Sequence, residues 1–286
     1  MVFRRESFLF RKVAILGVGL IGGSLGKALK KHKLAKEIFG VSRRKEALSI
    51  AVKSCAIDHG THDIKKAVVN ADLVVMATPV NVVSSMFKLI GPHLKRGCIV
   101  TDVGSTKMSI VTAAQEVLSN PAMFVGSHPL AGSEKRGVEF ATEDLFKGSI
   151  CIMTPVESTH RVTVDKVKRM WTAVGAQVKT VLPDEHDQML AYISHLPHLA
   201  AYALMSSVPE SYLSFAAQGL KDTTRIAASS PEVWSSICMA NSENLIKVID
   251  EYVGNLSNLR KAIVDVDGKA LTGELKRAKI KRDKMS

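Results

Sequence analysis

The chain has 286 residues, enough for about two domains with a sizeable core. Hydrophobic residues make up 46% of it, which excludes a disordered chain, and no apolar run reaches the roughly 18 residues of a membrane span. The formal net charge of +12 suits anionic ligands. Residues 1–12 hold no signal-peptide core, so we expect a cytoplasmic protein. We expect no metal, and reduced core or strand cysteines, because no metal-binding spacing joins Cys55, Cys98, Cys151 and Cys238.

A glycine-rich turn follows the first apolar run, Val13–Leu16, and opens a helical pattern rich in Lys, Ala and Leu. Gly17 permits the turn, Gly19 lets the backbone approach a pyrophosphate, and Gly22 lets the helix pack closely on the strand. The first helix N–H groups then face the phosphates. The pattern predicts a dinucleotide site, although glycine turns also occur without a ligand. The predicted cofactor contacts here are Gly17, Gly19, Leu20, Ile21 and Gly22.

The second apolar run, Ile38–Val41, leads into Ser42, Arg43 and Arg44. Folds that prefer NAD usually place an acidic residue about 20 positions after the glycines, where it binds the ribose 2′-hydroxyl. Ser42 stands there without a charge, and guanidinium groups pair well with a phosphate. These three residues therefore favour NADP, with NAD less favoured; the alternative interpretation is a solvated basic turn.

Apolar runs and helical patterns alternate through the first ~180 residues, which predicts an α/β fold with a doubly wound, mostly parallel sheet. The expected strands are Val13–Leu16, Ile38–Val41, Leu73–Ala77, Ile99–Asp102, Phe124–Ser127, Ile150–Thr154 and Val178–Val181, and expected helices include Val80–Ile90, Lys107–Leu118 and Val162–Val174. Ligands bind at the carboxyl ends of such strands. The turns at Thr78 and Pro79, at Ser105 and at His128 should therefore face one site, where we expect Thr78 and Pro79 to contact the cofactor.

Strand patterns stop near Pro183, so we expect a dinucleotide-binding domain over 1–183 and an all-helical domain over 184–286. The expected helices there are Glu185–Ser207, Leu213–Ala228, Pro231–Val253 and Leu256–Val266, with a break at Gly254. So much apolar helical surface is typical of a homodimer interface. The basic segment 269–286 is expected to be a solvated helix; nucleic-acid binding is the alternative, which the scarcity of aromatic residues disfavours.

Three histidines are candidates for chemistry. Oxidation of a carbinol needs a nearby base that works near neutral pH, and His128, directly after a strand, is best placed for that role. A structural turn histidine is the alternative. His195 and His198 lie three residues apart and share a helix face unless Pro197 kinks the helix.

Two cations and a serine are candidates for binding anions. Lys221 and Arg225 are four residues apart on one predicted helix face and together form a possible carboxylate clamp, unless Arg225 pairs with Asp222. Ser105 and Lys107 lie at a strand-to-helix turn that suits an anion, although Ser105 can also simply cap the helix.

Five segments in order along the chain carry a resemblance to the prephenate/arogenate dehydrogenases: Gly17–Gly22, Asp102–Lys107, Gly126–Gly132, Ser194–His198 and Lys221–Ala227. The resemblance implies a Rossmann domain, a helical dimerisation domain, and oxidative decarboxylation in tyrosine biosynthesis with a nicotinamide cofactor. It also implies that no nucleic acid or membrane is bound.

The same resemblance implies roles for individual residues. His128 takes the proton of the ring hydroxyl and Ser105 assists there. Arg225 binds a substrate carboxylate, and His198 contacts the substrate side chain with Lys221 and Ser133 close by.

Prephenate is favoured over arogenate because His198 can donate to its keto oxygen, while arogenate or dual use is the alternative. A β-hydroxyacid dehydrogenase is disfavoured because residues 185–207 contain no lysine. A protein that senses NADP(H) without turnover is the remaining alternative.

Overall fold

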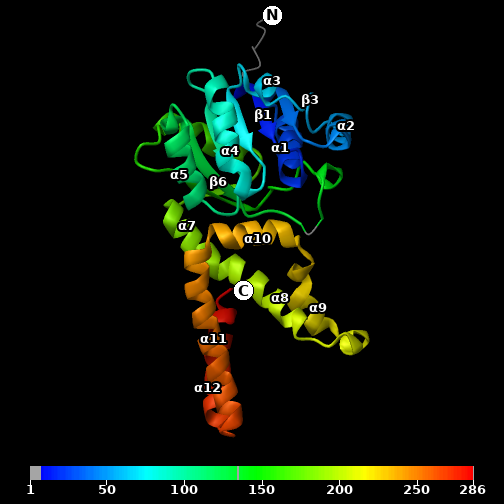
Figure 1. Cartoon of the computed structure of the whole chain (residues 1–286), viewed down its shortest axis with the longest axis vertical. Helices are drawn as coiled ribbons and strands as arrows, with labels where there is room; N and C mark the ends of the chain where they lie inside the picture. The colour runs from blue at the N-terminus through cyan, green and yellow to red at the C-terminus, as the bar shows by residue number, and fades with distance from the viewer. Residues whose placement is uncertain (1–7, 134, 286) are drawn as a thin grey trace, which may run out of the picture.

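A sheet-and-helix body and a helical arm make up the molecule, shown as a computed structural model in Figure 1. The structure describes residues 8–133 and 135–285. Residues 1–7, part of the segment examined for a signal peptide, lie outside these ranges. Among the helices described, none combines the length and apolarity needed to cross a membrane.

The body is built on one eight-stranded sheet in the order β3-β2-β1-β4-β5-β6-β7-β8. The strands are β1 Phe10–Leu16, β2 Ala35–Val41, β3 His59–Thr61, β4 Leu73–Met76, β5 Ile99–Asp102, β6 Phe124–Pro129, β7 Ile150–Thr154 and β8 Gln177–Thr180. Strands β1 to β6 pair in parallel, β7 is antiparallel to β6, and β8 is parallel to β7. The first six follow the order of dinucleotide-binding folds, so the predicted α/β class is confirmed.

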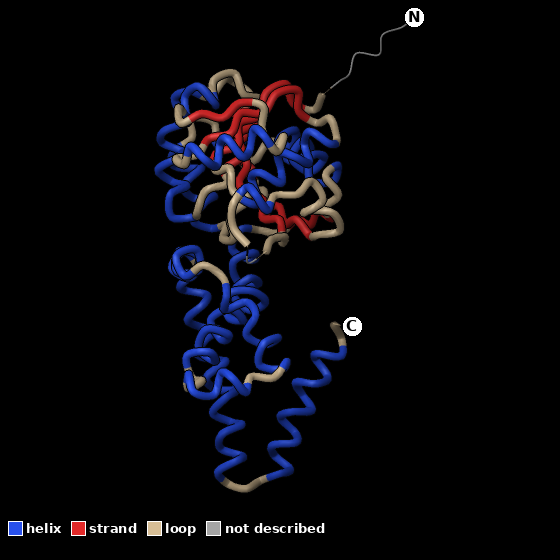
Figure 2. The backbone as a smooth tube through the Cα atoms, turned by 90° about the vertical axis from the view of Figure 1, so that its right-hand side faces the viewer, coloured by secondary structure: helices blue, strands red, loops and turns tan. Residues whose placement is uncertain are grey.

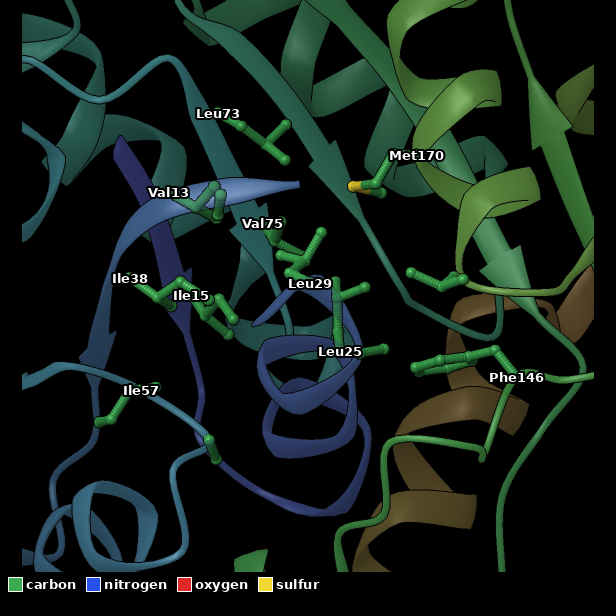
Figure 3. Close-up of a cluster of buried hydrophobic side chains, with 14 of the residues drawn as sticks. Val13, Ile15, Leu25, Leu29, Ile38, Ile57, Leu73, Val75, Phe146 and Met170 are labelled. Atoms are coloured by element: carbon green, nitrogen blue, oxygen red, sulfur yellow. The ribbon is translucent and has the colours of Figure 1, made fainter. Parts of the chain in front are cut away.

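Helices cover both faces of this sheet because each connection between parallel strands crosses over a face. They are α1 Leu20–Lys31, α2 Lys45–Lys53, α3 Ile64–Val68, α4 Val80–Ile90, α5 Met108–Val117 and α6 Arg161–Ala173. Two apolar clusters result, one on each face. Figure 3 shows the first, in which Leu25 and Leu29 of α1 lie against Val13 and Ile15 of β1. Each such buried side chain stabilises the body by about 1.5–3 kcal/mol.

The arm begins where the sheet ends and contains only helices. They are α7 Pro183–Leu190, a π-helical segment Ala191–His195, α8 Leu196–Ser206, α9 Gln218–Thr224, α10 Pro231–Ala240, α11 Ser242–Val264 and α12 Gly268–Asp283. Helix α10 lies under the body, and α11 and α12 form a long hairpin that projects away from it (Figures 1 and 2). The basic segment forms α12, whose side chains are mostly exposed, as expected for a solvated helix.

Three helix boundaries expected in the arm are wrong. The chain breaks at Asn241 rather than Gly254, and α11 continues through Gly254, because a glycine inside a long helix costs only about 1 kcal/mol. The stretch 185–207 is not one α-helix, because Pro197 lacks an N–H and the turn before it widens into the π-helical segment. The stretch 213–228 is split, with 3₁₀ turns at Glu210–Phe215 and Arg225–Ala228 on either side of α9.

The body differs from expectation in two smaller ways. Strand β3 was not predicted, since it has three residues, His59 to Thr61, and none of them is a buried apolar residue. Cys98 and Cys151 are buried as expected, but Cys55 is exposed and Cys238 is only partly buried.

Candidate active site

The glycine turn lies between the ends of β1 and β4, where the strand order reverses. Gly17 has a φ of +105°, and a Cβ there would lie 2.3 Å from the carbonyl oxygen of Ala77, so a side chain is excluded. Gly19 is the N-cap of α1, makes no side-chain cap hydrogen bond, and would have nothing within 4 Å of a Cβ. Open space thus lies at the start of α1, where the first N–H groups of a helix favour an anionic group.

A second feature at the same edge fits a bound dinucleotide. Thr78 follows β4, and its hydroxyl oxygen is buried without a hydrogen-bond partner among the described residues. A buried hydroxyl in that state costs free energy unless a ligand meets it. Together with the uncapped start of α1, the residues present therefore fit a dinucleotide cofactor, with Pro79 capping α4 beside Thr78.

Ser42 directly follows β2, next to the glycine turn, since the Gly17 N–H donates to the carbonyl of Val41 (2.9 Å). The Ser42 hydroxyl accepts from the Arg44 N–H (3.2 Å), and its carbonyl accepts from His62 Nδ1 (2.7 Å). Arg43 and Arg44 are exposed. The end of β2 is thus followed by an uncharged residue, Ser42, and by two exposed arginines, Arg43 and Arg44.

The strand ends at β5 and β6 are joined by a buried polar network. One oxygen of Asp102 accepts from the backbone N–H of Ser127 (3.0 Å), and the other accepts from the N–H of Gly104 (2.7 Å) and contacts the ammonium group of Lys107. Asp102 and Lys107 are both fully buried, so each neutralises the charge of the other at a place that water does not reach. This pair fixes the end of β6, where His128 lies.

His128 is the first member of a chain of hydrogen bonds that crosses from the body into the arm. Its Nδ1 lies 2.9 Å from Nε2 of His186, and His186 Nδ1 lies 2.8 Å from a carboxylate oxygen of Asp187. Both His186 and Asp187 belong to α7, and both are buried. His128, the predicted base, belongs to the body and is therefore held in place by two residues of the arm.

The chain assigns the tautomers of both rings. The Asp187 carboxylate only accepts, so His186 Nδ1 carries the proton and His186 Nε2 accepts from His128 Nδ1. The remaining His128 nitrogen, Nε2, then holds a lone pair. Burial has the largest effect and, together with the nearby charge of Lys107, lowers the pKa of His128 well below its ordinary value, so the ring is neutral near pH 7. His128 Nε2 is thus ready to accept a proton.

Asp187 has a second task at the start of α5. Its two oxygens accept from the backbone N–H groups of Lys107 (2.7 Å) and Met108 (2.9 Å), which are the first donors of that helix. The anion site expected at the turn of Ser105 and Lys107 is therefore wrong, because Asp187 fills the helix N-terminus and Asp102 holds the Lys107 ammonium. Ser105 itself is half-buried at this turn.

Asn241, at the break between α10 and α11, locks the same region. Its side-chain amide donates to the carbonyl of Asp187 (2.7 Å) and lies 3.1 Å from Nδ1 of His195, and its oxygen accepts from Asn244 (2.9 Å). Burial lowers the pKa of His195 to about 4, so this ring is neutral. Because the Asn241 amide donates to Nδ1, the His195 proton is on Nε2. His195 is thus held at Nδ1 by Asn241, while its buried Nε2 has no hydrogen-bond partner among the described residues.

The residues expected to bind substrate lie along α8 and the segment after it. His198 stacks on Trp234 of α10, with ring centroids 3.5 Å apart, and His195 meets the same indole at 6.0 Å. Burial lowers the pKa of His198, the hydrogen bond to the Ser194 carbonyl opposes this, and the charge of Arg225 lowers the pKa further. The side chains of Lys221 and Arg225 are exposed.

Asp222 and Ser133, which the sequence analysis also named, make contacts with neighbouring residues of their own segments. Asp222 accepts from the side-chain amide of Gln218 (2.6 Å), and no ion pair between Asp222 and Arg225 is found in the described ranges. Ser133 is exposed in the loop after β6, where its hydroxyl accepts from the Lys135 N–H (3.1 Å).

Four residues of the site had no sequence prediction: His186, Asp187, Asn241 and Trp234. The first two stand in the Pro-Asp-Glu-His-Asp start of α7, which looks like an ordinary acidic first helical turn. Asn241 lies inside what looks like one continuous helical pattern. The sequence offered one sign of these residues, which is that His186 precedes the two candidate histidines His195 and His198 by only a few helical turns.

A dinucleotide cradle and an oriented, neutral histidine at one edge of a parallel sheet define a nicotinamide-dependent dehydrogenase. Two family models match this chain. "Prephenate dehydrogenase, nucleotide-binding domain" covers residues 25–180, and "Prephenate dehydrogenase, dimerization domain" covers residues 182–277. The chain belongs to the prephenate dehydrogenase family.

Named relatives agree with the family models. The chain is 35% identical to the prephenate dehydrogenase of Bacillus subtilis, over 95% of this chain and 75% of that protein. It is 33% identical to the cyclohexadienyl dehydrogenase of Zymomonas mobilis, over 94% of each. The crystal structure of Aquifex aeolicus prephenate dehydrogenase with hydroxyphenyl propionate and NAD+ has a TM-score of 0.89 and 35% identity, covering 96% of this chain and 98% of that one.

Proposed function

We propose that this enzyme oxidatively decarboxylates prephenate to 4-hydroxyphenylpyruvate with NADP as the hydride acceptor. The observation that carries the proposal is the chain from His128 through His186 to Asp187, which leaves a lone pair on His128 Nε2 at the cofactor edge of the sheet. The names of the relatives supply the substrate class. Arogenate, which bears an amino group in place of the side-chain keto group, is the second candidate.

The chemistry needs a base that holds one proton while two bonds break. The ring of prephenate carries a hydroxyl and a carboxylate on opposite carbons of a cyclohexadiene. A bound nicotinamide would supply the acceptor for the hydride of the carbon that bears the hydroxyl. His128 Nε2 accepts the hydroxyl proton as positive charge develops, and the carboxylate leaves as CO₂ while its bonding electrons complete the aromatic ring. The proton returns to the phenol oxygen, so the overall reaction consumes none.

Substrate binding in this proposal depends on the arm. Arg225 binds a carboxylate of the substrate and Lys221 adds positive charge on the same side. His198 contacts the side chain, Ser105 hydrogen-bonds near the ring hydroxyl, and Ser133 lies at the loop after β6. The residues mainly orient the substrate and stabilise its charges.

The preference for NADP rests on the edge that follows β2. An uncharged Ser42 does not repel a 2′-phosphate, and the exposed Arg43 and Arg44 are free to approach one. We also propose a homodimer, because apolar side chains such as Ile246, Val253 and Leu256 lie exposed along α11. A cytoplasmic location stays a prediction.

The test is a set of four assays: initial rates with prephenate or arogenate, each with NADP⁺ or NAD⁺, following the reduced cofactor. Turnover of prephenate with NADP⁺ faster than with NAD⁺ is the expected result. Turnover of arogenate alone would move the assignment to the second candidate. No turnover in any assay, with NADP(H) binding intact, would replace the proposal by a sensing role.

A further inference from the structure

Strands β2 and β3 end side by side at the carboxyl edge of the sheet, and each is followed by a polar residue. The parallel register pairs Val41 with Thr61, the last residue of each strand. Ser42 and His62 come next, and His62 Nδ1 lies 2.7 Å from the backbone carbonyl oxygen of Ser42. His62 therefore stands beside the position at which dinucleotide-binding folds meet the 2′-oxygen of the ribose.

The contact with Ser42 assigns the proton of a neutral His62 ring. A carbonyl oxygen accepts and never donates, so Nδ1 carries the hydrogen and Nε2 has the lone pair. Nε2 has no hydrogen-bond partner among the residues that the structure describes, and the side chain is exposed. A neutral ring thus presents an acceptor to a ligand at this edge, whereas a protonated ring presents a donor and a positive charge.

The turn between β2 and α2 is suited to an anion. Arg44 is the N-cap of α2, and its side chain makes no cap hydrogen bond. The first N–H groups of a helix favour an anion. The Ser42 hydroxyl oxygen accepts from the Arg44 N–H (3.2 Å), which leaves the hydroxyl hydrogen for a ligand. Arg43 and Arg44 are exposed beside it.

The charges next to His62 are mostly positive. Besides the two arginines, the turn after β2 and the start of α3 carry Lys45, Glu46, Asp63, Lys65 and Lys66. The carboxylate of Asp63 already caps α3, where it accepts from the Lys66 N–H (3.1 Å). Glu37, near the other end of β2, is paired with His59 (2.9 Å). A phosphate at this turn therefore meets more cations than anions.

We propose that His62 belongs to a subsite for the 2′-phosphate of NADP, and that NADP binds together with a proton on this ring. Nε2–H of the protonated ring donates to a phosphate oxygen, next to the guanidinium groups of Arg43 and Arg44. NAD has a hydroxyl in place of the phosphate and gains nothing from that charge. Because binding and protonation are linked, the preference for NADP over NAD rises as the pH falls through the range in which imidazole gains its proton. This inference rests on the NADP preference in the proposed function.

The test measures the dissociation constants of NADPH and NADH, by fluorescence of the reduced cofactor, from about pH 8.5 to about pH 6.5, a window in which imidazole gains a proton. The window ends above the second ionisation of a phosphate monoester, at about pH 6, so the phosphate stays mostly dianionic. Groups that act equally on both cofactors cancel in the ratio of the NADH constant to the NADPH constant. This ratio is expected to rise by about fivefold toward the lower pH, as one charge-assisted hydrogen bond forms at an exposed site.

Three variants isolate the ring. His62→Gln keeps a donor for the Ser42 carbonyl but cannot take a charge, so its ratio should be independent of pH. His62→Arg is charged throughout and should hold the ratio high at both ends of the window. The matched control is His59→Gln, which removes the exposed histidine at the other end of β3 and should keep the wild-type profile. Binding of NADH checks that each variant is folded.

A wild-type ratio that favours NADPH but is flat, or falls toward low pH, would overturn the inference while the NADP preference stands. A wild-type slope that persists in His62→Gln would also overturn it. Tighter binding of NADH than of NADPH by the wild type at every pH would overturn the NADP preference itself, and the inference with it.

Discussion

The body and the arm bury different kinds of side chain. In the body, whole strands such as β4 are inaccessible and apolar. In the arm, large apolar residues are exposed, including Phe215 and Val266, at 84% and 89%. The buried residues of the arm are nearly as often polar as apolar, and they include His186, Asp187 and Asn241.

This contrast shows what each of the two parts contributes to the candidate site. The body has an apolar core of its own, and the contacts that hold its glycine turn lie within it. Buried polar residues of the arm, among them His186 and Asp187, lie where the arm meets the body, and they orient His128. In the proposed mechanism the base thus comes from one region, while the residues that set its tautomer and the proposed anchor for substrate come from the other.

The largest expected effect tests the residue that the body contributes. Changing His128 to Asn removes the proton acceptor and should lower kcat by about 100- to 10,000-fold, while NADP binding, followed by fluorescence of the reduced cofactor, stays unchanged. The control is His32→Asn, which replaces the exposed C-cap residue of α1. Activity near that of the wild type in His128→Asn would remove His128 from the role of base.

The next effect tests the anchor that the arm contributes. Arg225→Ala should raise KM by about 10- to 100-fold, with a smaller effect on kcat, because one charge-assisted hydrogen bond to a carboxylate is lost. Arg260→Ala on α11, also exposed, should leave KM unchanged. If the two variants have the same KM, Arg225 does not bind substrate.

A smaller change is expected at the cofactor edge, which belongs entirely to the body. Ser42→Asp places a carboxylate where a 2′-phosphate would lie and should lower the preference for NADP over NAD by about tenfold, measured as a ratio of kcat/KM values. Ser49→Asp, on the exposed side of α2, is the matched control. An unaltered ratio in Ser42→Asp would refute the argument for the 2′-phosphate.

The smallest effect concerns how firmly the arm holds the body. Asp187→Asn weakens the contacts to the Lys107 and Met108 N–H groups and should lower the free energy of unfolding by about 1–3 kcal/mol, measured with denaturant. Asp184→Asn, exposed in the first turn of the same helix, should change it little. Equal stability of both variants would mean that Asp187 does not join the two regions.

The same division decides what could be predicted from the sequence. Strands β5 and β7 and helix α4 were predicted with their observed bounds, because short apolar runs and helical periodicity belong to the local sequence. The glycine turn was found for the same reason. His186 and Asp187 were missed because they are ordinary polar residues of a first helical turn until α7 docks on α5. Asn241 was missed because only its tertiary contacts show that the chain turns there.

The most direct test of this account is a double-mutant cycle on kcat with prephenate and NADP⁺. His186→Asn keeps a donor for Asp187 but removes the acceptor that orients His128 Nδ1, so alone it should lower kcat. If His186 acts through His128, adding His186→Asn to His128→Asn should lower kcat no further. A double variant whose loss equals the product of the two single losses would contradict the claim that the arm orients the body's base.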